Sequence, residues 1–372
     1  MPQPDLIVVG AGIVGLAHAL AAARRGRRVL VIDRDTAANG ASIRNFGFVT
    51  VTGQEAGRVW SLARRSADIW REVAAAAGIP VVQRGLLLAA QRPEAEAVLD
   101  AFLATEMGAD CRRLGRAALA ADWPMVRDAR AALWSPHDLR VDSPTAIPLL
   151  AGWLQAAHGV RFAYGVAVHA VGEGRVETTI GTLHAERIVV CPGDDGGQLF
   201  PTMFAEAGIT RCKLQMLRLA PPDWRLAAPM MGDLSMVRYA GYAALPEAKA
   251  LAARLAGEAA AAAALADGIH LIVVQGADGT LVVGDSHHYA ATPDPFASDA
   301  VDRRILHAFE EILGPPPPVV ARWTGIYASA ADHSIVRTPA PDVRLVVVTS
   351  GTGASTAFAL AEEVIADLMG DA

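Results

Sequence analysis

Short apolar runs bounded by polar or glycine-rich turns recur along the chain, and two of them stand close together near its start. Leu6–Val9 and Val29–Ile32 are separated by a glycine-containing turn and an alanine-rich apolar stretch, and the second run ends at Asp33. Such runs are typical of buried strands, and a longer apolar stretch between two of them is typical of a helix packed on a parallel sheet. The pattern predicts strand, turn, helix, strand and terminal acid.

The same criteria predict elements along the rest of the chain. Helical spacing, start signals such as Asp142-Ser143-Pro144 and stop signals such as Gly78 predict helices over residues 55–77, 93–107, 142–158, 247–266 and 356–369. Runs with strand character predict strands over residues 81–90, 161–164, 166–171, 176–180, 187–191, 213–219, 236–242, 270–275, 281–284 and 343–349. The turn before the last helix, residues 350–355, is again rich in glycine.

The first turn has the spacing of a dinucleotide-binding loop, Gly10-x-Gly12-x-x-Gly15. Gly10 permits the tight turn, Gly12 lets a diphosphate approach the backbone, and Gly15 lets the helix lie close to the strand. Free N–H groups at the helix start then hold the phosphates. The carboxylate of Asp33 can accept hydrogen bonds from both ribose hydroxyls and repels a 2′-phosphate, which disfavours NADP. The residues alone leave FAD and NAD open.

The fold class that follows is α/β (α+β), because strand, glycine-rich turn and helix occur at both ends of the chain and antiparallel-looking strands lie between them. We expect a Rossmann-like nucleotide-binding domain formed by residues 1–80, 142–212 and 322–372. An inserted, mainly antiparallel substrate domain is expected from residues 81–141 and 213–321.

Composition and charge narrow the class of protein. The 372 residues are 52% hydrophobic and 19% charged, which is enough for a large core. The formal net charge of −6 is spread without a basic stripe, so we expect no nucleic-acid partner. The apolar run from Leu6 to Ala23 imitates a membrane span, but its glycine spacing and the lack of a basic lead-in argue against a span or a signal peptide.

Cysteine usage predicts neither disulfides nor a metal centre. Cys111, Cys191 and Cys212 are the three cysteines of the chain, and they form no C-x-x-C pair. No histidines have metal-ligand spacing along the sequence. We therefore expect reduced thiols, a cytoplasmic location and no bound metal. The oligomeric state stays open, with a homo-oligomer as one alternative.

Five motifs in this order resemble the D-amino acid oxidase superfamily of FAD-dependent amine oxidases, which includes glycine oxidase, sarcosine oxidase and D-amino acid dehydrogenases. The resemblance spans nearly the whole chain. The motifs are Gly10-x-Gly12-x-x-Gly15 with Asp33, Ala41-Ser42-x-Arg44-Asn45-x-Gly47, Val189-Val190-Cys191-Pro192-Gly193, Trp323-x-Gly325 and Val347-x-x-Gly351-x-Gly353.

The resemblance implies FAD as the cofactor. It is expected to be non-covalent, because no cysteine lies in the C-terminal region where some sarcosine oxidases attach flavin. By this resemblance Asp33 binds the adenosine ribose, backbone near Ala167 meets the adenine, the loop 42–48 runs along the flavin, and the turn 351–355 faces the pyrimidine end of its ring. The cofactor-binding residues implied are Gly10, Gly12, Ile13, Val14, Gly15, Asp33, Arg34, Ser42, Arg44, Asn45, Phe46, Gly47, Ala167, Cys191, Gly193, Gly351, Thr352, Gly353, Ala354 and Ser355.

The substrate clamp departs from the family pattern. Members acting on α-amino acids usually show W-x-G-L-R-P, whose arginine pairs with the substrate carboxylate, but the corresponding residue here is Tyr327. Glycine oxidase carries a second arginine where this chain has Ala354. Other candidates to hold an anion or donate a hydroxyl are Arg44, Arg238, His287, His288, Tyr239, Tyr242, Tyr289 and Tyr327. We take Tyr327, His287, Arg44 and Phe48 as the candidate catalytic residues.

The loop Ser42–Phe48, together with Gly284-Asp285-Ser286-His287, most resembles a subgroup associated with phosphonate breakdown. This implies a small aminophosphonate substrate, such as aminoethylphosphonate or its N-methyl form, oxidised by hydride transfer to FAD, with oxygen or another electron acceptor as partner. One alternative is a glycine, sarcosine or D-amino acid oxidase or dehydrogenase. Another is a non-catalytic nucleotide-binding redox sensor.

Overall fold

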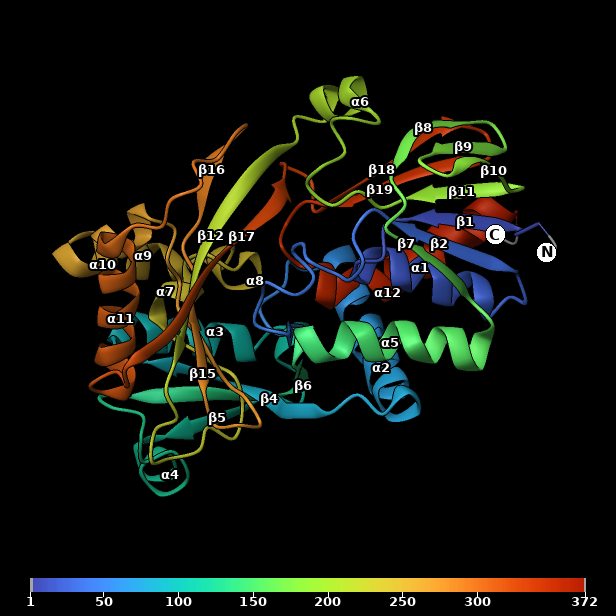
Figure 1. The fold of residues 1–372 in the computed structure, drawn as a ribbon. Coiled ribbons are helices and arrows are strands. Elements are labelled where there is room, and N and C mark those ends of the chain that lie inside the picture. The colour runs from blue at the N-terminus through green and yellow to red at the C-terminus, as the bar shows by residue number, and fades with distance from the viewer. Residues whose placement is uncertain (1–2, 371–372) are drawn as a thin grey trace.

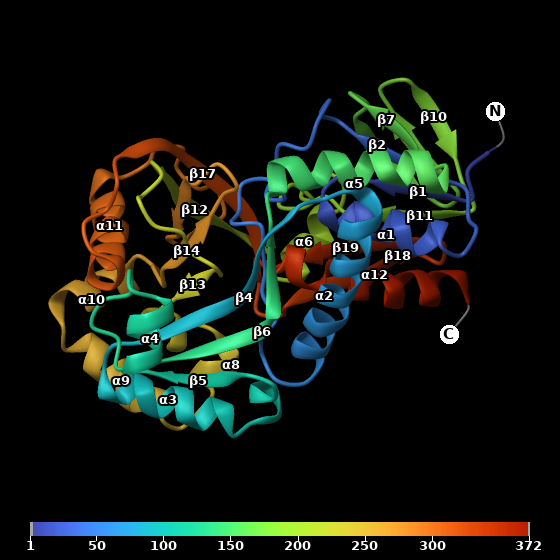
Figure 2. The ribbon, with the colours of Figure 1, turned by 90° about the horizontal axis from the view of Figure 1, so that it is seen from below.

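The computed structural model describes residues 3–370 and shows two regions, each built around one large sheet (Figures 1 and 2). The helices are α1 (Ile13–Ala23), α2 (Arg58–Ala77), α3 (Pro93–Leu103), α4 (Arg116–Asp122), α5 (Ser143–His158), α6 (Pro201–Glu206), α7 (Asp233–Met236), α8 (Ala240–Ala243), α9 (Ala248–Ala256), α10 (Ala259–Ala266), α11 (Asp299–Leu313) and α12 (Gly353–Met369), with a 3₁₀ turn at Glu106–Gly108.

The first sheet has six strands in the order β18-β19-β11-β1-β2-β7. These strands are β1 (Leu6–Val9), β2 (Val29–Asp33), β7 (Arg161–Tyr164), β11 (Arg187–Val190), β18 (Ser334–Ala340) and β19 (Val343–Val348). All neighbours are parallel except β18 and β19. Helices α1, α2, α5 and α12 pack against one another along one face, and the small sheet β8 (Val168–Gly172), β9 (Arg175–Thr178) and β10 (Gly181–His184) lies on the other side (Figure 1).

Strand order places the two glycine-rich turns at the same edge of this sheet. Strands β1 and β19 both pair in parallel with β11, one on each side of it. Each of the two ends in a glycine-rich turn that leads into a helix, α1 or α12. Because the carboxyl ends of parallel strands meet at one edge, the first and last helices of the chain begin beside each other there.

The second sheet has ten strands, of which eight follow the order β16-β12-β15-β14-β13-β4-β6-β3, while β17 pairs with β12 and β5 with β6. They are β3 (Phe48–Val49), β4 (Val81–Ala90), β5 (Arg112–Gly115), β6 (Ala131–Val141), β12 (Thr210–Leu219), β13 (Met230–Met231), β14 (Ile272–Gln275), β15 (Leu281–Gly284), β16 (His288–Ala290) and β17 (Val319–Ser329). All pairs are antiparallel except β13 with β4. Strands β3 and β17 pair here although the predicted nucleotide-binding segments include residues 48–49 and 322–329. The domain boundaries themselves stay a prediction.

Two predicted elements are wrong for tertiary reasons. Residues 236–242, predicted as a strand, belong mostly to the short helices α7 and α8, because the N–H of Gly241 donates to the carbonyl of Gly53 at 3.0 Å and holds this segment against a loop. The helix predicted over 247–266 is broken between α9 and α10. Glu258 is extended there, and its carboxylate pairs with Arg92.

Within residues 3–370, no helix combines the length and apolar character that a membrane crossing would require. The apolar run that imitates a span is divided between β1, the glycine loop and α1.

The buried imidazole of His18 in α1 predicts acid sensitivity. Its side chain is 0% exposed, and burial lowers its pKa from 6.5 to about 4. In the unfolded chain His18 binds a proton as the pH falls below 6.5, whereas in the folded chain it does so only near pH 4. The folded state is therefore progressively destabilised as the pH falls from 6.5 to 4. We expect the unfolding free energy, measured in urea, to fall between pH 7 and pH 5, with about 2 kcal/mol of the loss due to His18.

The variant His18→Gln should lose this contribution and show a flatter pH dependence, whatever its absolute stability. His184→Gln, at an exposed position, is the matched control and should keep the wild-type pH dependence. An unchanged slope in His18→Gln would show that His18 titrates alike in both states.

Candidate active site

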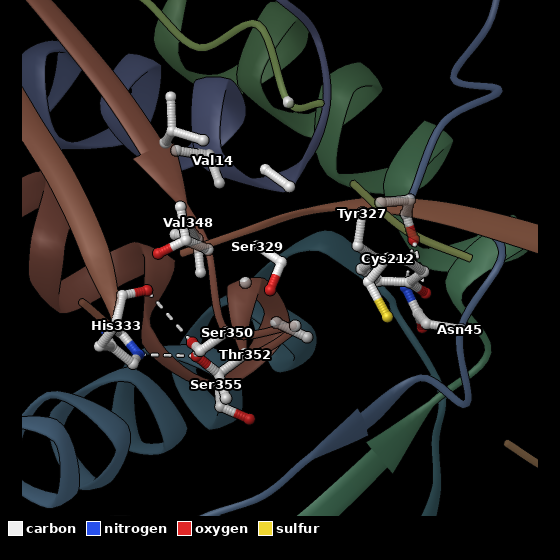
Figure 3. Close-up of a pocket in the computed structure, with 18 of the residues that line it drawn as sticks. Val14, Asn45, Cys212, Tyr327, Ser329, His333, Val348, Ser350, Thr352 and Ser355 are labelled. Atoms are coloured by element: carbon white, nitrogen blue, oxygen red, sulfur yellow. Dashed lines mark hydrogen bonds between the residues drawn. The ribbon is translucent and has the colours of Figure 1, made fainter. Parts of the chain in front are cut away.

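One cavity of about 530 Å³ brings the two glycine-rich turns together with polar side chains of the antiparallel sheet (Figure 3). Pockets of this size are typical of cofactor and small-molecule sites. Of the residues implied to bind cofactor, those lining it are Gly12, Ile13, Val14, Gly15, Ser42, Asn45, Phe46, Cys191, Gly193, Gly351, Thr352, Gly353, Ala354 and Ser355. Phe48, His287 and Tyr327 of the catalytic candidates line it as well.

The first glycine turn tolerates no side chain at two of its positions. A Cβ atom on Gly10, whose φ is +106°, would lie 2.3 Å from the carbonyl oxygen of Cys191. A Cβ atom on Gly15 would lie 1.8 Å from the carbonyl oxygen of Gly10. At the helix start, Ile13 donates its N–H to Ser42 Oγ at 2.9 Å. Gly10 and Gly15 therefore let the turn pack closely against neighbouring backbone, and the helix start that lines the cavity, residues 12–15, is the kind of position that binds phosphate.

Asp33 lies at the end of β2 and reaches the same loop. Its Oδ2 accepts the N–H of Ala11 at 2.6 Å, and its Oδ1 accepts the N–H of Asp35 at 2.9 Å. Arg34 pairs with Asp195, and the backbone N–H of Ala167 donates to Thr179 Oγ1 at 3.2 Å. None of Asp33, Arg34 and Ala167 is among the residues that line the cavity.

The second turn is shorter than predicted, because α12 begins at Gly353 and so includes Ala354 and Ser355. Its conformation is held from three directions. Thr352 Oγ1 bonds to His333 Nε2 at 2.6 Å (Figure 3). Ser355 Oγ accepts the N–H of Thr50 at 2.8 Å, and Trp70 Nε1 donates to the carbonyl of Ala354 at 2.7 Å. Burial lowers the pKa of His333 to about 4, which keeps its ring neutral near this turn.

The loop over residues 41–47 is pinned by its own asparagine. Asn45 Oδ1 accepts hydrogen bonds from the N–H of Gly47 at 2.6 Å and from Ser143 Oγ at 2.7 Å. Gly47, at φ +69°, has no room for a Cβ atom, which would lie 1.7 Å from the carbonyl oxygen of Val141. This loop bonds to the start of α1 through Ser42 and lines the cavity through Asn45 and Phe46, and its conformation is tightly constrained.

Arg44 and Tyr327 are joined through the backbone. Tyr327 Oη donates to the carbonyl of Arg44 at 3.2 Å, while the guanidinium of Arg44 donates to Asn39 Oδ1 at 3.0 Å. Arg44 is not among the lining residues, although Tyr327 is. The position that carries an arginine in the family motif therefore holds a phenol that supports the 41–47 loop.

Another part of the cavity is lined by residues in and beside the antiparallel sheet, and it carries charge of both signs. Arg238, Tyr239, Tyr289, His270, Asp285 and His287 line it. Arg238 Nη2 donates to Tyr289 Oη at 2.8 Å. Two other candidates, His288 and Tyr242, do not line the cavity. His288 Nε2 lies 3.2 Å from Asp267 Oδ1, and Tyr242 is fully buried in the core.

The sequence analysis missed His270 and Asp285 as site residues. His270 precedes β14 and Asp285 follows β15, and these strands form a hairpin in which Ile272 pairs with Gly284. The ends of a hairpin meet, so the two side chains lie together, 3.2 Å from Nε2 to Oδ1. The glycine-containing turn between the two predicted strands predicts a hairpin over residues 272–284. Recognising that hairpin would have placed His270 and Asp285 side by side.

The geometry fits a dinucleotide cofactor extended between the two turns. A Cβ atom on Gly12 would lie 2.8 Å from Ser42 Oγ, so glycine keeps this wall of the cavity open, while Gly193 and Gly351 face open space. Gly353 and Ala354, the first residues of α12, line the cavity, and the N–H groups at the start of a helix favour negative charge.

The sequence matches the family described as FAD dependent oxidoreductase (DAO) over residues 5–368. No similar sequence was found among curated proteins.

Similar solved structures include glycine oxidase from Bacillus cereus ATCC 14579, with 16% identity and a TM-score of 0.79, covering 100% of this chain and 96% of that one. L-proline dehydrogenase from P. horikoshii has 17% identity and a TM-score of 0.80, covering 100% and 95%. L-alpha-glycerophosphate oxidase from Mycoplasma pneumoniae, solved with FAD bound, has 15% identity and a TM-score of 0.76, covering 99% and 95%. At these identities the structures show the shared fold, and the sequence match shows that the chain belongs to the DAO family of FAD-dependent oxidoreductases.

Proposed function

We propose that this protein oxidises a small amine that also carries an anionic group, and that the substrate is an aminophosphonate such as aminoethylphosphonate or its N-methyl form. The observation that carries the proposal is that two groups of opposite charge, which act on each other, both line the cavity. Arg238 supplies a cation there and the buried Asp285 supplies a carboxylate. A zwitterionic substrate matches this arrangement, because its anion and its amine each meet the opposite charge.

The chain's own residues orient and enclose the substrate. FAD, when bound, supplies the acceptor for the hydride that leaves the carbon next to nitrogen. Phe46, Phe48 and Leu214 line the cavity with apolar surface, which excludes water from the reacting carbon. Hydrolysis of the oxidised C=N product by water then gives a carbonyl compound and the freed amine. We infer that FAD is held without a covalent bond, so acid precipitation should release it.

The test is an anaerobic screen of the purified yellow protein. Aminoethylphosphonate, its N-methyl form, glycine, sarcosine and D-amino acids are mixed with it in turn, and bleaching of the FAD absorbance is followed. Faster bleaching by the aminophosphonates supports the proposal. Preference for glycine, sarcosine or a D-amino acid would instead support the alternative substrate class, since a guanidinium pairs with carboxylate as well as with phosphonate. Oxygen uptake with peroxide release then separates an oxidase from a dehydrogenase.

Arg238→Gln is expected to raise KM for aminoethylphosphonate on the order of 10- to 100-fold, because a charged hydrogen-bonded pair contributes about 1.5–3 kcal/mol. The KM for ethylamine, which has no anionic group, should change much less. Arg225→Gln, at an exposed loop position, is the control. Equal changes for both amines in Arg238→Gln would remove Arg238 from anion recognition.

A further inference from the structure

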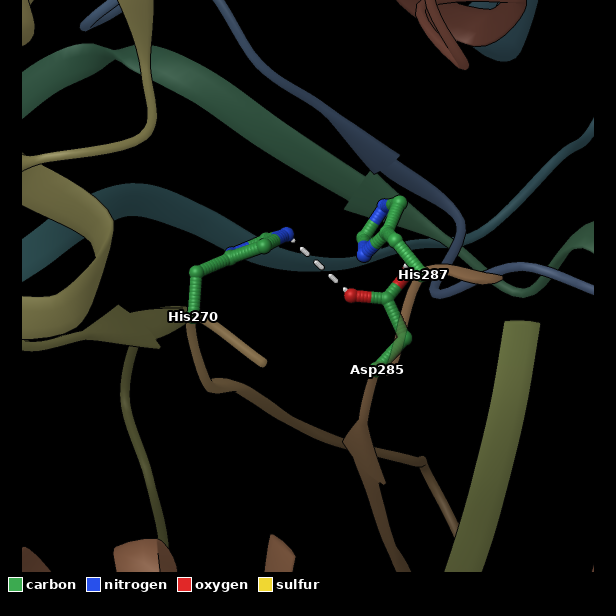
Figure 4. Close-up of side chains that lie close together, drawn as sticks. All are labelled: His270, Asp285 and His287. Atoms are coloured by element: carbon green, nitrogen blue, oxygen red, sulfur yellow. Dashed lines mark ion pairs between the residues drawn. The ribbon is translucent and has the colours of Figure 1, made fainter. Parts of the chain in front are cut away.

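A cluster of three polar side chains, His270, Asp285 and His287, lies in the sheet-side wall of the cavity. His270 is 4% exposed and Asp285 is 5% exposed. Asp285 Oδ1 lies 3.2 Å from His270 Nε2, and Asp285 Oδ2 lies 3.9 Å from His287 Nε2. Figure 4 shows the polar ends of all three side chains directed toward one another.

A hydrogen bond to the backbone determines the tautomer of His287 and leaves its Nε2 atom as the acceptor that faces the cluster. Its Nδ1 lies 2.9 Å from the carbonyl oxygen of Gly268, which only accepts, so Nδ1 carries the hydrogen. Burial lowers the pKa of His287 to about 4, so its ring is neutral at pH 7 and Nε2 holds a lone pair. A lone pair and a carboxylate oxygen, both acceptors, therefore face each other across 3.9 Å.

The carboxylate of Asp285 keeps its charge in this surrounding. Burial opposes ionisation of Asp285, but the nearby Arg238 guanidinium and His270 favour it, and the pKa of Asp285 lies below its usual value. Within the part of the chain described, Oδ1 of Asp285 has no donor with hydrogen-bond geometry. A buried charge without full pairing is costly, so the cluster has the character of a binding site for a cation that donates N–H groups.

We infer that the His270–Asp285–His287 cluster binds the substrate's ammonium group, which donates N–H hydrogen bonds to Asp285 and to His287 Nε2. This inference rests on the proposed function and names the part of the site that recognises nitrogen. An ammonium has donors for both facing acceptors. Charge-assisted hydrogen bonds of about 2.8 Å bridge two acceptors 3.9 Å apart without moving either.

The spacing fits a metal ion less well. Ligand atoms at about 2.1 Å from a tetrahedral ion lie roughly 3.4 Å apart, closer than the Oδ2 and Nε2 atoms here. A metal-ligating histidine also donates its second ring nitrogen to an acceptor. His270 Nδ1 is buried and has no partner among residues 3–370.

Binding of the amine beside Asp285 fixes the direction in which kcat changes with pH. An opposite charge beside the bound amine favours its protonated form, so Asp285 raises the pKa of the bound nitrogen. The oxidation needs the neutral amine, so kcat should rise with pH toward that raised value. The other titratable or charged groups that act on Asp285 are Cys212 on β12, Arg238 and Tyr239 between α7 and α8, His270, His287, and Tyr327 on β17.

The experiment compares FAD-loaded wild-type protein with Asp285→Asn, His287→Gln and the control Asp278→Asn, the same substitution at the exposed turn of the same hairpin. Dissociation constants are measured anaerobically for 2-aminoethylphosphonate and for ethylphosphonate, which lacks the nitrogen. Asp285→Asn should weaken 2-aminoethylphosphonate binding on the order of 100-fold and ethylphosphonate binding less than about threefold. Its kcat–pH profile should move to lower pH.

Other results of this experiment would contradict either the ammonium site or the proposed oxidation. Equal loss for both ligands, no loss, or wild-type protein that binds the two ligands alike would overturn the inference. One zinc per chain in the wild type, lost in Asp285→Asn, would overturn it in favour of a metal site. If Asp285→Asn does not fold, the selective loss is sought in His287→Gln. Selective binding of the amine without FAD bleaching by any amine would leave the ammonium site intact and refute the proposed oxidation.

Discussion

Gly10→Ala is expected to give a protein that has lost most of its FAD and its yellow colour. The new Cβ atom would lie 2.3 Å from the backbone carbonyl of Cys191, and the φ of +106° is one that alanine rarely adopts. Backbone on both sides leaves no flexible side chain to yield, so β1 and β11 must separate or the loop must move. We expect FAD affinity to fall about tenfold or more, since each 1.4 kcal/mol of distortion is a factor of ten.

The measurement is the ratio of FAD absorbance to protein absorbance after gel filtration, with the affinity determined by titration of the stripped protein. Gly40→Ala is the matched control, because a Cβ atom there meets nothing within 4 Å. It should keep the full cofactor content. Full FAD content in Gly10→Ala would mean that this loop does not hold the diphosphate.

Asp138→Ala is expected to lower the free energy of unfolding by about 3 kcal/mol or more. Asp138 is 1% exposed, and its carboxylate accepts hydrogen bonds from Val51 N at 2.7 Å, Thr52 N at 3.0 Å and Thr52 Oγ1 at 2.5 Å. Hydrogen bonds to a charged group contribute about 1.5–3 kcal/mol each, and two backbone N–H groups would be left buried and unpaired. The loss should appear in urea unfolding at pH 7.

This substitution should also reach the active site. Thr50 and Gln54 line the cavity, and the N–H of Thr50 donates to Ser355 Oγ at 2.8 Å, so a loosened 50–54 loop releases the start of α12. Asp122→Ala, at an exposed helix end, should change stability by less than about 0.5 kcal/mol. A loss of comparable size in both variants would show that Asp138 does not organise the loop.

The parts of the fold that the sequence predicts well are those set by local pattern. The β1–α1–β2 unit, the strand at 81–90 and the helix from Ser143 follow from apolar runs, glycine spacing and a proline at the helix start. Residues 236–242 do not follow, because their composition suits a strand while the contact between Gly241 and Gly53 decides their conformation. That contact joins segments nearly 190 residues apart, so no local rule contains it.

The same distinction between local pattern and long-range contact applies to the candidate site. Both glycine turns and the Asn45 loop line the cavity, because a motif carries its own backbone geometry. Arg44 shares a motif with Asn45, yet its guanidinium lies against Asn39, since the direction of a long side chain depends on its neighbours in space. His270 and Asp285 become partners through a hairpin register, which sequence spacing alone does not reveal.

The position of β11 between β1 and β19 has a consequence for biosynthesis. The glycine loop before α1 is synthesised well before α12, which starts at Gly353 and forms another wall of the same cavity. A nascent chain therefore lacks that wall of the cavity until α12 has been made. We expect FAD to be loaded only after α12 has folded, and chains that stop before α12 to retain it poorly.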